Sequence, residues 1–149
     1  MNESISSVDV THNPGLLEYH ANNLNLTELP DLTKCKFLMS IHMGDRGGGV
    51  YLDRPDYFSA WPDMFSVNLG GYTLEEIDFT ANKRIEGVWA DGMPNMVVFD
   101  LSPLVALQRI DVNNCPALKT ILVNENVDIS SLEIKKNGTG ELEIKHKMN

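Results

Sequence analysis

Apolar residues recur along this chain with the spacing LxxLxL, in which most x positions are polar. From residue 74 onward six triplets follow one another, each starting eleven residues after the last, and all eighteen of their positions are apolar. They are Leu74, Ile77, Phe79; Ile85, Val88, Ala90; Met96, Phe99, Leu101; Leu107, Ile110, Val112; Leu118, Ile121, Val123; and Ile129, Leu132, Ile134. An amphipathic helix would repeat every 3.6 residues, so the pattern predicts a short strand in every eleven residues.

The N-terminal third follows the same pattern, with one irregular stretch. Its triplets are Ile5, Val8, Val10; Leu16, Tyr19, Ala21; and Leu38, Ile41, Met43, while Leu26, Leu29 and Leu32 are displaced by about a residue. From Leu38 to Leu74 the chain runs 36 residues, three more than three intervals of eleven. The irregularity therefore lies in one segment, at about 44–63, and "MFSVNL" (64–69) is expected to resume the strands.

One such unit is too small to bury its own apolar face. Stacked units share a continuous core, and each strand pairs with those of its neighbours. The sequence therefore predicts a single domain over 1–149, a mainly β solenoid of short parallel strands with little helix, interrupted by a loop insertion at about 44–63.

The LxxLxLxxN pattern resembles the leucine-rich repeat family, in the compact bacterial and bacteriophage form with about 22 residues per coil and two similar halves. The resemblance implies about six to seven coils. It also implies a ladder of Asn or Cys three residues after the third apolar position. That slot holds Asn13, Cys35, Asn82, Cys115, Asn126 and Asn137, whereas Leu24, Met93 and Leu104 depart from it. Cys35 and Cys115 match no zinc spacing, so buried, reduced thiols are expected.

The segment "GDRGGGVYLDRPDYFSAWPD" (44–63) combines a Gly cluster, two prolines and aromatic residues. No GK[ST] follows the glycines, so the segment is not a phosphate-binding loop. Long loops on rigid scaffolds often carry recognition, which makes Tyr51, Tyr57, Phe58 and Trp61 candidate anchors for a partner. The alternative is that these aromatic residues fold back and close the side of the solenoid.

Residues between the apolar positions are expected to face solvent. One series of coils would display Glu18, His20, Ser40, His42, Glu76, Asp78, Val98, Asp100, Thr120 and Leu122; the other would display Ser7, Asp9, Gly87, Trp89, Arg109, Asp111, Ser131 and Glu133. Trp89 is a candidate binding hot spot, or else it covers an adjacent loop. Further candidates for contact with a partner are His20, His42, Asp78, Asp100 and Leu122.

Two pairs of outward residues could carry chemistry. His20 and His42 are 22 residues apart and should stack on neighbouring coils, but a metal would need further ligands, so no metal is expected. Asp78 and Asp100 have the same spacing and could form a carboxylate pair, although a solvated face explains them as well. No nucleophile motif accompanies either pair, and no cofactor is expected.

The charge and the absence of targeting signals narrow the setting. A net charge of −9 disfavours nucleic acid and anionic membranes as partners. No apolar run reaches the length of a membrane span, and "MNESISSVDV" does not resemble a signal peptide. The localisation favoured on these grounds is cytoplasmic or in a virion, rather than the cell surface.

Together these features predict a non-enzymatic protein-binding or structural module, as a subunit of a bacterial or bacteriophage assembly such as a virion decoration or baseplate. Neighbouring chains would then cover the solenoid ends, for which no cap helix is evident. One alternative is a ligand-binding or adhesive ectodomain fragment of a bacterial surface or secreted protein, with a protein or a glycan as partner. A more remote alternative is an enzyme with its site at the 44–63 loop, built on Asp53, Asp56 and His42.

Overall fold

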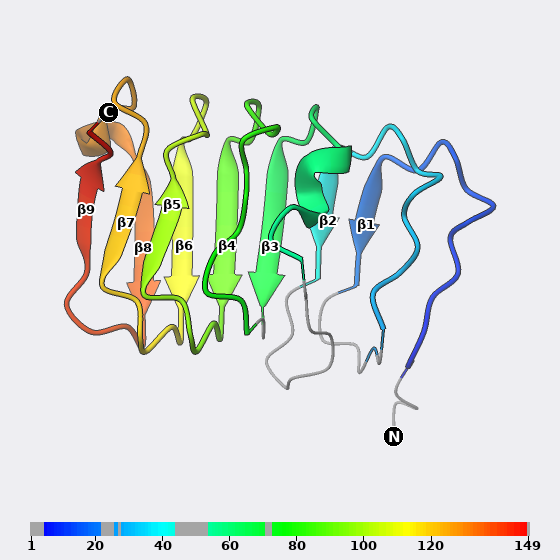
Figure 1. The fold of residues 1–149 in the computed structure, drawn as a ribbon, viewed down its shortest axis with the longest axis horizontal. Helices are drawn as coiled ribbons and strands as arrows, with labels where there is room; N and C mark the ends of the chain where they lie inside the picture. Colours follow the sequence, from blue (N-terminus) through cyan, green and yellow to red (C-terminus); the bar gives the residue numbers. More distant parts are fainter. Residues whose placement is uncertain (1–4, 22–25, 27, 44–53, 71–72, 149) are drawn as a thin grey trace.

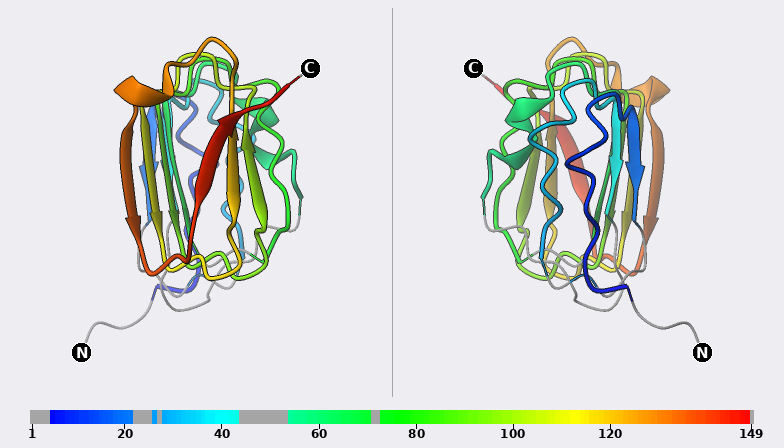
Figure 2. Two further views of the ribbon diagram at one scale, coloured as in Figure 1. Left: turned by 90° about the vertical axis from the view of Figure 1, so that its left-hand side faces the viewer. Right: turned by 90° about the vertical axis from the view of Figure 1, so that its right-hand side faces the viewer.

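The computed structural model describes residues 5–21, 26, 28–43, 54–70 and 73–148, which form a parallel β-solenoid (Figure 1). Two sheets face each other across an apolar interior, as the end-on views show (Figure 2). In the described residues the larger sheet contains, in order, β1 (Glu18–His20), β2 (Ser40–His42), β3 (Ser66–Gly70), β4 (Gly87–Asp91), β6 (Arg109–Asn113) and β8 (Glu133–Asn137). The smaller sheet contains β5 (Val98–Leu101), β7 (Thr120–Val123) and β9 (Glu143–His146).

Helical structure in the described residues is limited to two 3-10 turns, η1 (Tyr57–Ala60) and η2 (Ile129–Ser131). All strand pairs of both sheets are parallel. The predicted solenoid of short parallel strands with little helix is therefore confirmed. The described strands make about five turns, which is close to the expected six to seven coils.

Alternation of side chains across each strand separates an interior face from a solvent face. The aligned inward positions of the first five strands of the larger sheet are apolar and at most 5% exposed, and they are Tyr19, Ile41, Val67, Val88 and Ile110. In the opposite wall Phe58 stacks on Phe79, with ring centroids 5.9 Å apart, and Phe79 lies 6.4 Å from Phe99. The interior is thus continuous from coil to coil, as expected for units that cannot fold singly.

The aromatic residues of the 54–61 segment belong to this interior. Tyr57, Phe58 and Trp61 are 8%, 0% and 5% exposed. The Trp61 Nε1–H donates to the carbonyl of Cys35 at 2.9 Å, and the Tyr57 hydroxyl donates to the carbonyl of Pro30 at 3.4 Å. The structure therefore matches the fold-back alternative, and these three side chains are not accessible anchors for a partner. Tyr51 and Asp53 lie outside the described residues.

The register across the irregular segment differs from the expected one. Glu18 and Ser40 pair across one regular coil, whereas the next pairs join Ser40 to Ser66, across a longer interval, and Ser66 to Gly87, across a slightly shorter one. A complete strand, β3, is thus placed within the stretch that breaks the eleven-residue pattern, and "MFSVNL" does resume the strands. Trp89 consequently lies in the same sheet as His20 and His42. Their assignment to two different series was wrong, because Asn68 of β3 aligns with both His42 and Trp89, so two full coils separate these rings.

A second shift occurs near the C-terminal end. Arg109 pairs with Glu133 instead of Ser131, and Lys135 instead of Glu133 lies beside Asp111. The longer path of the chain is accommodated where η2 turns it before β8. The expected alignment of Ser131 with Arg109 was therefore incorrect.

The polar ladder is real but shorter than expected. Asn82 is fully buried, and its Nδ2 donates to the carbonyls of Phe58 and Trp61 at 2.9 Å each. Cys35 and Cys115 are also buried as free thiols, and each thiol lies near carbonyl oxygens of the preceding coil. By contrast the ladder positions nearer the ends are exposed, namely Asn13, Asn126 and Asn137.

Candidate functional site

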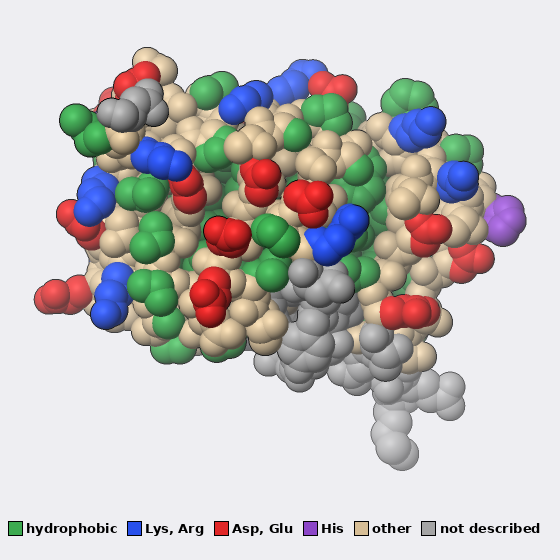
Figure 3. All heavy atoms as spheres, in the orientation of Figure 1, with side chains coloured by type: hydrophobic (Ala, Val, Ile, Leu, Met, Phe, Trp, Pro, Cys, Tyr) green, Lys and Arg blue, Asp and Glu red, His purple; other side chains and the backbone are tan. Residues whose placement is uncertain are grey.

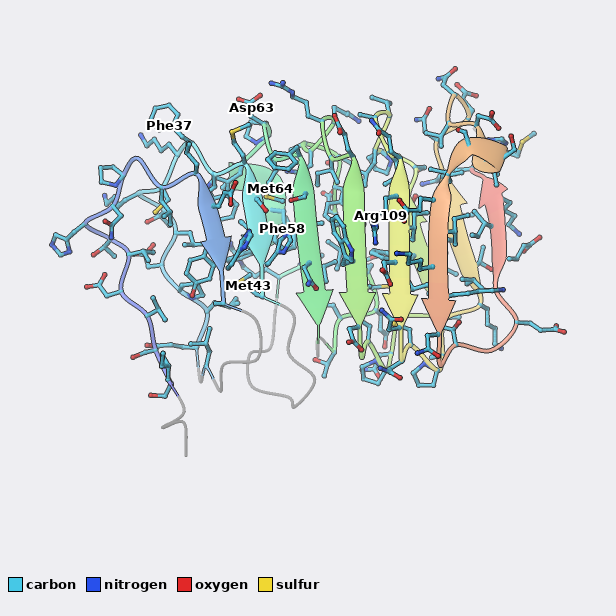
Figure 4. The ribbon with its side chains drawn as sticks, turned by 180° about the vertical axis from the view of Figure 1, so that it is seen from behind. Phe37, Met43, Phe58, Asp63, Met64 and Arg109 are labelled. Atoms are coloured by element: carbon cyan, nitrogen blue, oxygen red, sulfur yellow. The ribbon has the colours of Figure 1, made fainter. Side chains whose placement is uncertain are left out.

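The solvent face of the larger sheet carries two rows of side chains that run across the strands. One row consists of Glu18, Ser40, Ser66, Gly87, Arg109 and Glu133, and the other of His20, His42, Asn68, Trp89, Asp111 and Lys135. Figure 4, which views the molecule from behind, has this face toward the reader, with Arg109 on β6. We call the second row the ring row, because His20, His42 and Trp89 dominate it.

Planar side chains of the ring row lie against one another. The His20 and His42 rings are stacked, with centroids 4.3 Å apart and an interplanar angle of 11°. This confirms the stacking expected from their spacing. The indole of Trp89 lies 5.7 Å from the His42 ring. It also lies 5.3 Å from the guanidinium carbon of Arg109. An electron-rich indole face attracts a guanidinium, so Arg109 helps to hold the ring in place.

Small residues in the adjacent row make space for these rings. An added Cβ at Gly87 would come within 2.6 Å of two atoms of the Trp89 benzene ring, so only glycine permits this approach. Ser40 and Ser66 are 2% and 6% exposed, and their hydroxyl oxygens are 2.7 Å apart. The imidazoles and the indole thus pack over three small residues at successive coils, Ser40, Ser66 and Gly87. We call these three residues the serine floor.

Arg109 connects the rings to a cluster of charged side chains at one end of the face. Its guanidinium lies 3.3 Å from the Glu133 carboxylate and 3.6 Å from that of Asp111. The Nε atom is buried and has no hydrogen-bond partner among the described residues. Lys135 lies 3.5 Å from the same Glu133 carboxylate, so two cations and two carboxylates balance at this end of the face.

A row of exposed apolar side chains borders the face where its strands begin. Leu17, Met39 and Phe65 each directly precede a strand, and they are 52%, 38% and 37% exposed. The amide of Met39 donates to the Leu17 carbonyl and that of Phe65 to the Met39 carbonyl, both at 2.8 Å, so the three residues are adjacent. Phe37, 67% exposed, lies near the same edge (Figure 4).

Sequence reasoning missed this apolar row, although a signal for it is present. In "LLEY", "LMSI" and "MFSV" the residue after the first apolar position is also apolar, whereas the next coils of the sheet have Glu86 and Gln108 there. Apolar side chains clustered on the solvent face of a sheet are typical of interaction surfaces. The row continues into a groove of about 630 Å³ lined by Phe65, Ser66, Gly87, Trp89, Arg109 and Glu133, among others.

Electrostatics distinguish the two imidazoles. Burial lowers the pKa of His42, positive charge on His20 lowers it further, and the Glu18 carboxylate acts in the opposite direction. The Glu18 carboxylate lies 3.8 Å from Nε2 of His20. Nε2 of each imidazole is 3.3 Å from a serine hydroxyl, of Ser40 for His20 and of Ser66 for His42. These hydroxyls are buried beneath the rings and present no nucleophile to solvent.

The two aspartates singled out from the sequence lie on the opposite side of the solenoid. Asp78 and Asp100 line one hollow together with Asp56, and Figure 3 shows acidic side chains toward the middle of that face. Asp56 is therefore on the other face from His42, so no site joining them is present in the described residues. Leu122, on β7 of the smaller sheet, is partly exposed.

These aspartates have a structural role. Asp78 accepts a hydrogen bond from the amide of Thr80 at 2.8 Å, and Asp100 accepts one from that of Ser102 at 3.0 Å. Asp9, Asp31 and Asp128 do the same two residues before a Thr or Ser. Hydrogen bonds from Thr80 lower the pKa of Asp78. Burial raises the pKa of Asp100, but hydrogen bonds from Lys147 and Ser102 outweigh it and bring this pKa below its ordinary value. Both carboxylates thus fix turns of the repeat.

Two kinds of feature are absent from the described part of the chain. No cluster of three or more His, Cys, Asp or Glu side chains in it is placed to hold a metal ion. It also contains no helix with the length and hydrophobicity that a bilayer span needs.

No protein-family model matches the sequence, and no curated protein matches it. Among solved structures the fold is similar to the functional domain of InlJ from Listeria monocytogenes, which includes a cysteine ladder. The TM-score is 0.55 at 16% sequence identity, and the match covers 91% of this chain. It covers 37% of the InlJ chain, so this chain spans little more than a third of that length. At this identity the likeness shows the β-solenoid fold alone, and nothing in it supports a bacteriophage origin.

Proposed function

We propose that this chain is a non-enzymatic binding module of a bacterial protein, and that it holds a protein partner on the solvent face of the larger sheet. The observation that carries the proposal is the exposed apolar row of Leu17, Met39 and Phe65 beside the ring row. Hot spots in protein interfaces are enriched in aromatic side chains that lie near the centre of the contact, with polar groups around them. Trp89 has this setting, because the apolar row lies on one side of it and Arg109 with its carboxylates on the other.

Rigidity supports the same proposal. The face is formed by parallel strands paired in register from coil to coil, so its side chains are held in place before binding. Preorganised contacts lose less side-chain entropy when a complex forms. Of the two settings expected from the sequence, the similarity to InlJ favours a part of a bacterial surface or secreted protein over a virion subunit.

Affinity capture with matched variants tests the proposal. The chain is immobilised, proteins retained from extracts of the source organism and of cells it contacts are identified, and the affinity of each purified candidate is measured by calorimetry. Met39→Ser and Phe65→Ser should each weaken binding by about tenfold or more, since hot-spot truncations cost about 2 kcal/mol or more. Val98→Ser is the matched control, because Val98 is an equally exposed apolar residue (43%) on the smaller sheet.

Two outcomes would contradict the proposal. One is a purified partner whose affinity is unchanged by both substitutions of the apolar row. The other is a partner whose binding is lost on Val98→Ser alone, which would place the site on the opposite face.

A further inference from the structure

A chain of hydrogen bonds links the two imidazoles of the ring row through buried hydroxyls. Nε2 of His20 lies 3.3 Å from Oγ of Ser40, Oγ of Ser40 lies 2.7 Å from Oγ of Ser66, and Oγ of Ser66 lies 3.3 Å from Nε2 of His42. Ser40 and Ser66 are 2% and 6% exposed, so water has little access to the middle of the chain. Both ends of the chain belong to rings that also stack on each other.

The number of protons decides which charge states this chain can hold. Three hydrogen bonds need three protons, and the two hydroxyls supply one each. The third comes from one imidazole, while the other accepts at Nε2. A protonated imidazole always carries a hydrogen on Nε2. One protonated ring therefore fits. With two, both rings donate to the serines, and the hydrogen of one buried hydroxyl is left without an acceptor in the chain, which costs free energy.

We propose that the His20–Ser40–Ser66–His42 chain is a pH-sensitive latch of the ring row, closed while at most one of the two rings is protonated and opened by the second proton. The effect on partner binding rests on the function proposed above; the latch itself does not. Stacking favours the same behaviour, because two imidazolium ions with centroids 4.3 Å apart repel each other.

The surroundings indicate which ring is protonated second. On β1 the Glu18 carboxylate, 3.8 Å from Nε2 of His20, stabilises a positive charge on that ring. The His42 ring contacts the neutral Ser66 of β3 and the Trp89 indole of β4. The Arg109 cation lies against the same indole. Among the described residues, therefore, no carboxylate contacts His42 directly. Burial and the neighbouring ring both lower the pKa of His42, so the second proton goes to His42.

Opening the latch would change the face at its centre. The His42 ring packs against Trp89, so its displacement removes one support of the indole. The direction of the pH effect follows from the lowered pKa of His42: the folded protein resists protonation, and the unfolded chain accepts the proton near pH 6.5. The contribution to stability is complete above that pH and decreases as the pH falls below it. Partner binding is expected to weaken in the same acidic range.

NMR titration of the imidazole Cε1–H signals, from pH 8 to pH 4.5 in the unchanged chain, tests the latch without a partner. A sample unfolded in urea supplies the reference midpoint. His42 should titrate at lower pH in the folded chain than in the unfolded sample, because burial and the neighbouring ring lower its pKa. Assignments come from single His→Gln variants.

Ser66→Ala separates the hydrogen-bond chain from simple burial. Without the Ser66 hydroxyl no hydrogen is left unpaired when His42 gains its proton, so the His42 midpoint should rise toward that of the unfolded sample. Thr120→Ala, a partly exposed position of the smaller sheet, is the control and should leave the His42 midpoint unchanged.

The latch is refuted if His42 titrates at the same pH in the folded chain as in the unfolded sample, or if Ser66→Ala leaves the His42 midpoint unchanged. Failure of the proposed docking face gives a different result, since a partner would then bind normally to Met39→Ser and Phe65→Ser while these titrations remained as expected.

Discussion

Replacement of Phe58 by alanine tests whether the aromatic segment after residue 54 is part of the core. The Phe58 side chain is fully buried and stacks on Phe79, with ring centroids 5.9 Å apart. Truncation of a buried phenylalanine to alanine costs about 3–5 kcal/mol, because transfer free energy is lost and a cavity remains. We therefore expect the free energy of unfolding to fall by about 4 kcal/mol.

This loss can be converted into a melting temperature. For 149 residues an unfolding entropy of about 2.1 cal/mol/K per residue amounts to about 0.31 kcal/mol/K, so the midpoint should fall by about 13 °C. Thermal unfolding followed by circular dichroism, with urea titration as a second measurement, gives the values. Should Phe58→Ala fail to fold, Phe58→Leu offers a milder change of about 1–1.5 kcal/mol, or about 3–5 °C.

Phe37→Ala is the matched control, because Phe37 is 67% exposed. Its effect should stay within about 0.5 kcal/mol. If Phe58→Ala destabilises the chain no more than Phe37→Ala does, Phe58 is not a core residue. The segment would then return to consideration as an exposed recognition loop.

Three further predictions follow from the ladder and the ring row. Asn82→Ala should lower the free energy of unfolding by about 2–4 kcal/mol in urea titrations, because two buried carbonyls lose their donor. Asn82→Cys keeps a weak S–H donor and should cost less. Equal losses for the two variants would contradict the donor role of Asn82. Burial raises the pKa of both thiols, Cys35 and Cys115. Ellman's reagent at pH 8 should therefore modify them slowly until urea unfolds the chain. Rapid reaction of the folded protein would contradict their burial. Gly87→Ala should push the Trp89 indole away from the strand and alter its fluorescence. The free energy of unfolding should change by less than about 1–2 kcal/mol, because the ring can move toward solvent. An unaltered emission spectrum would show that the close approach is absent.

Much of the fold can be read from the sequence, because each unit repeats one physical requirement. A strand of three to five residues must bury alternate side chains against its neighbours. The LxxLxL spacing expresses this directly, and it predicted the parallel strands, the solenoid and the stacking of His20 on His42. These features depend on local spacing alone and are repeated from coil to coil. The burial of the two thiols was expected from the resemblance to leucine-rich repeats.

Only the tertiary structure decided how the coils align across the irregular segment. Between β2 and β4 the chain makes one long turn, from Ser40 to Ser66, and then a shorter one to Gly87, and no local rule fixes how such an excess is divided. The division depends on where Tyr57, Phe58 and Trp61 find space in the core, which is a matter of packing between distant coils. It brings Trp89 onto the same face as His20 and His42, and Leu17 and Met39 beside Phe65. The sequence by itself thus determined the repeating unit, whereas the composition of the candidate binding face, with its serine floor and apolar edge, arises from register between coils.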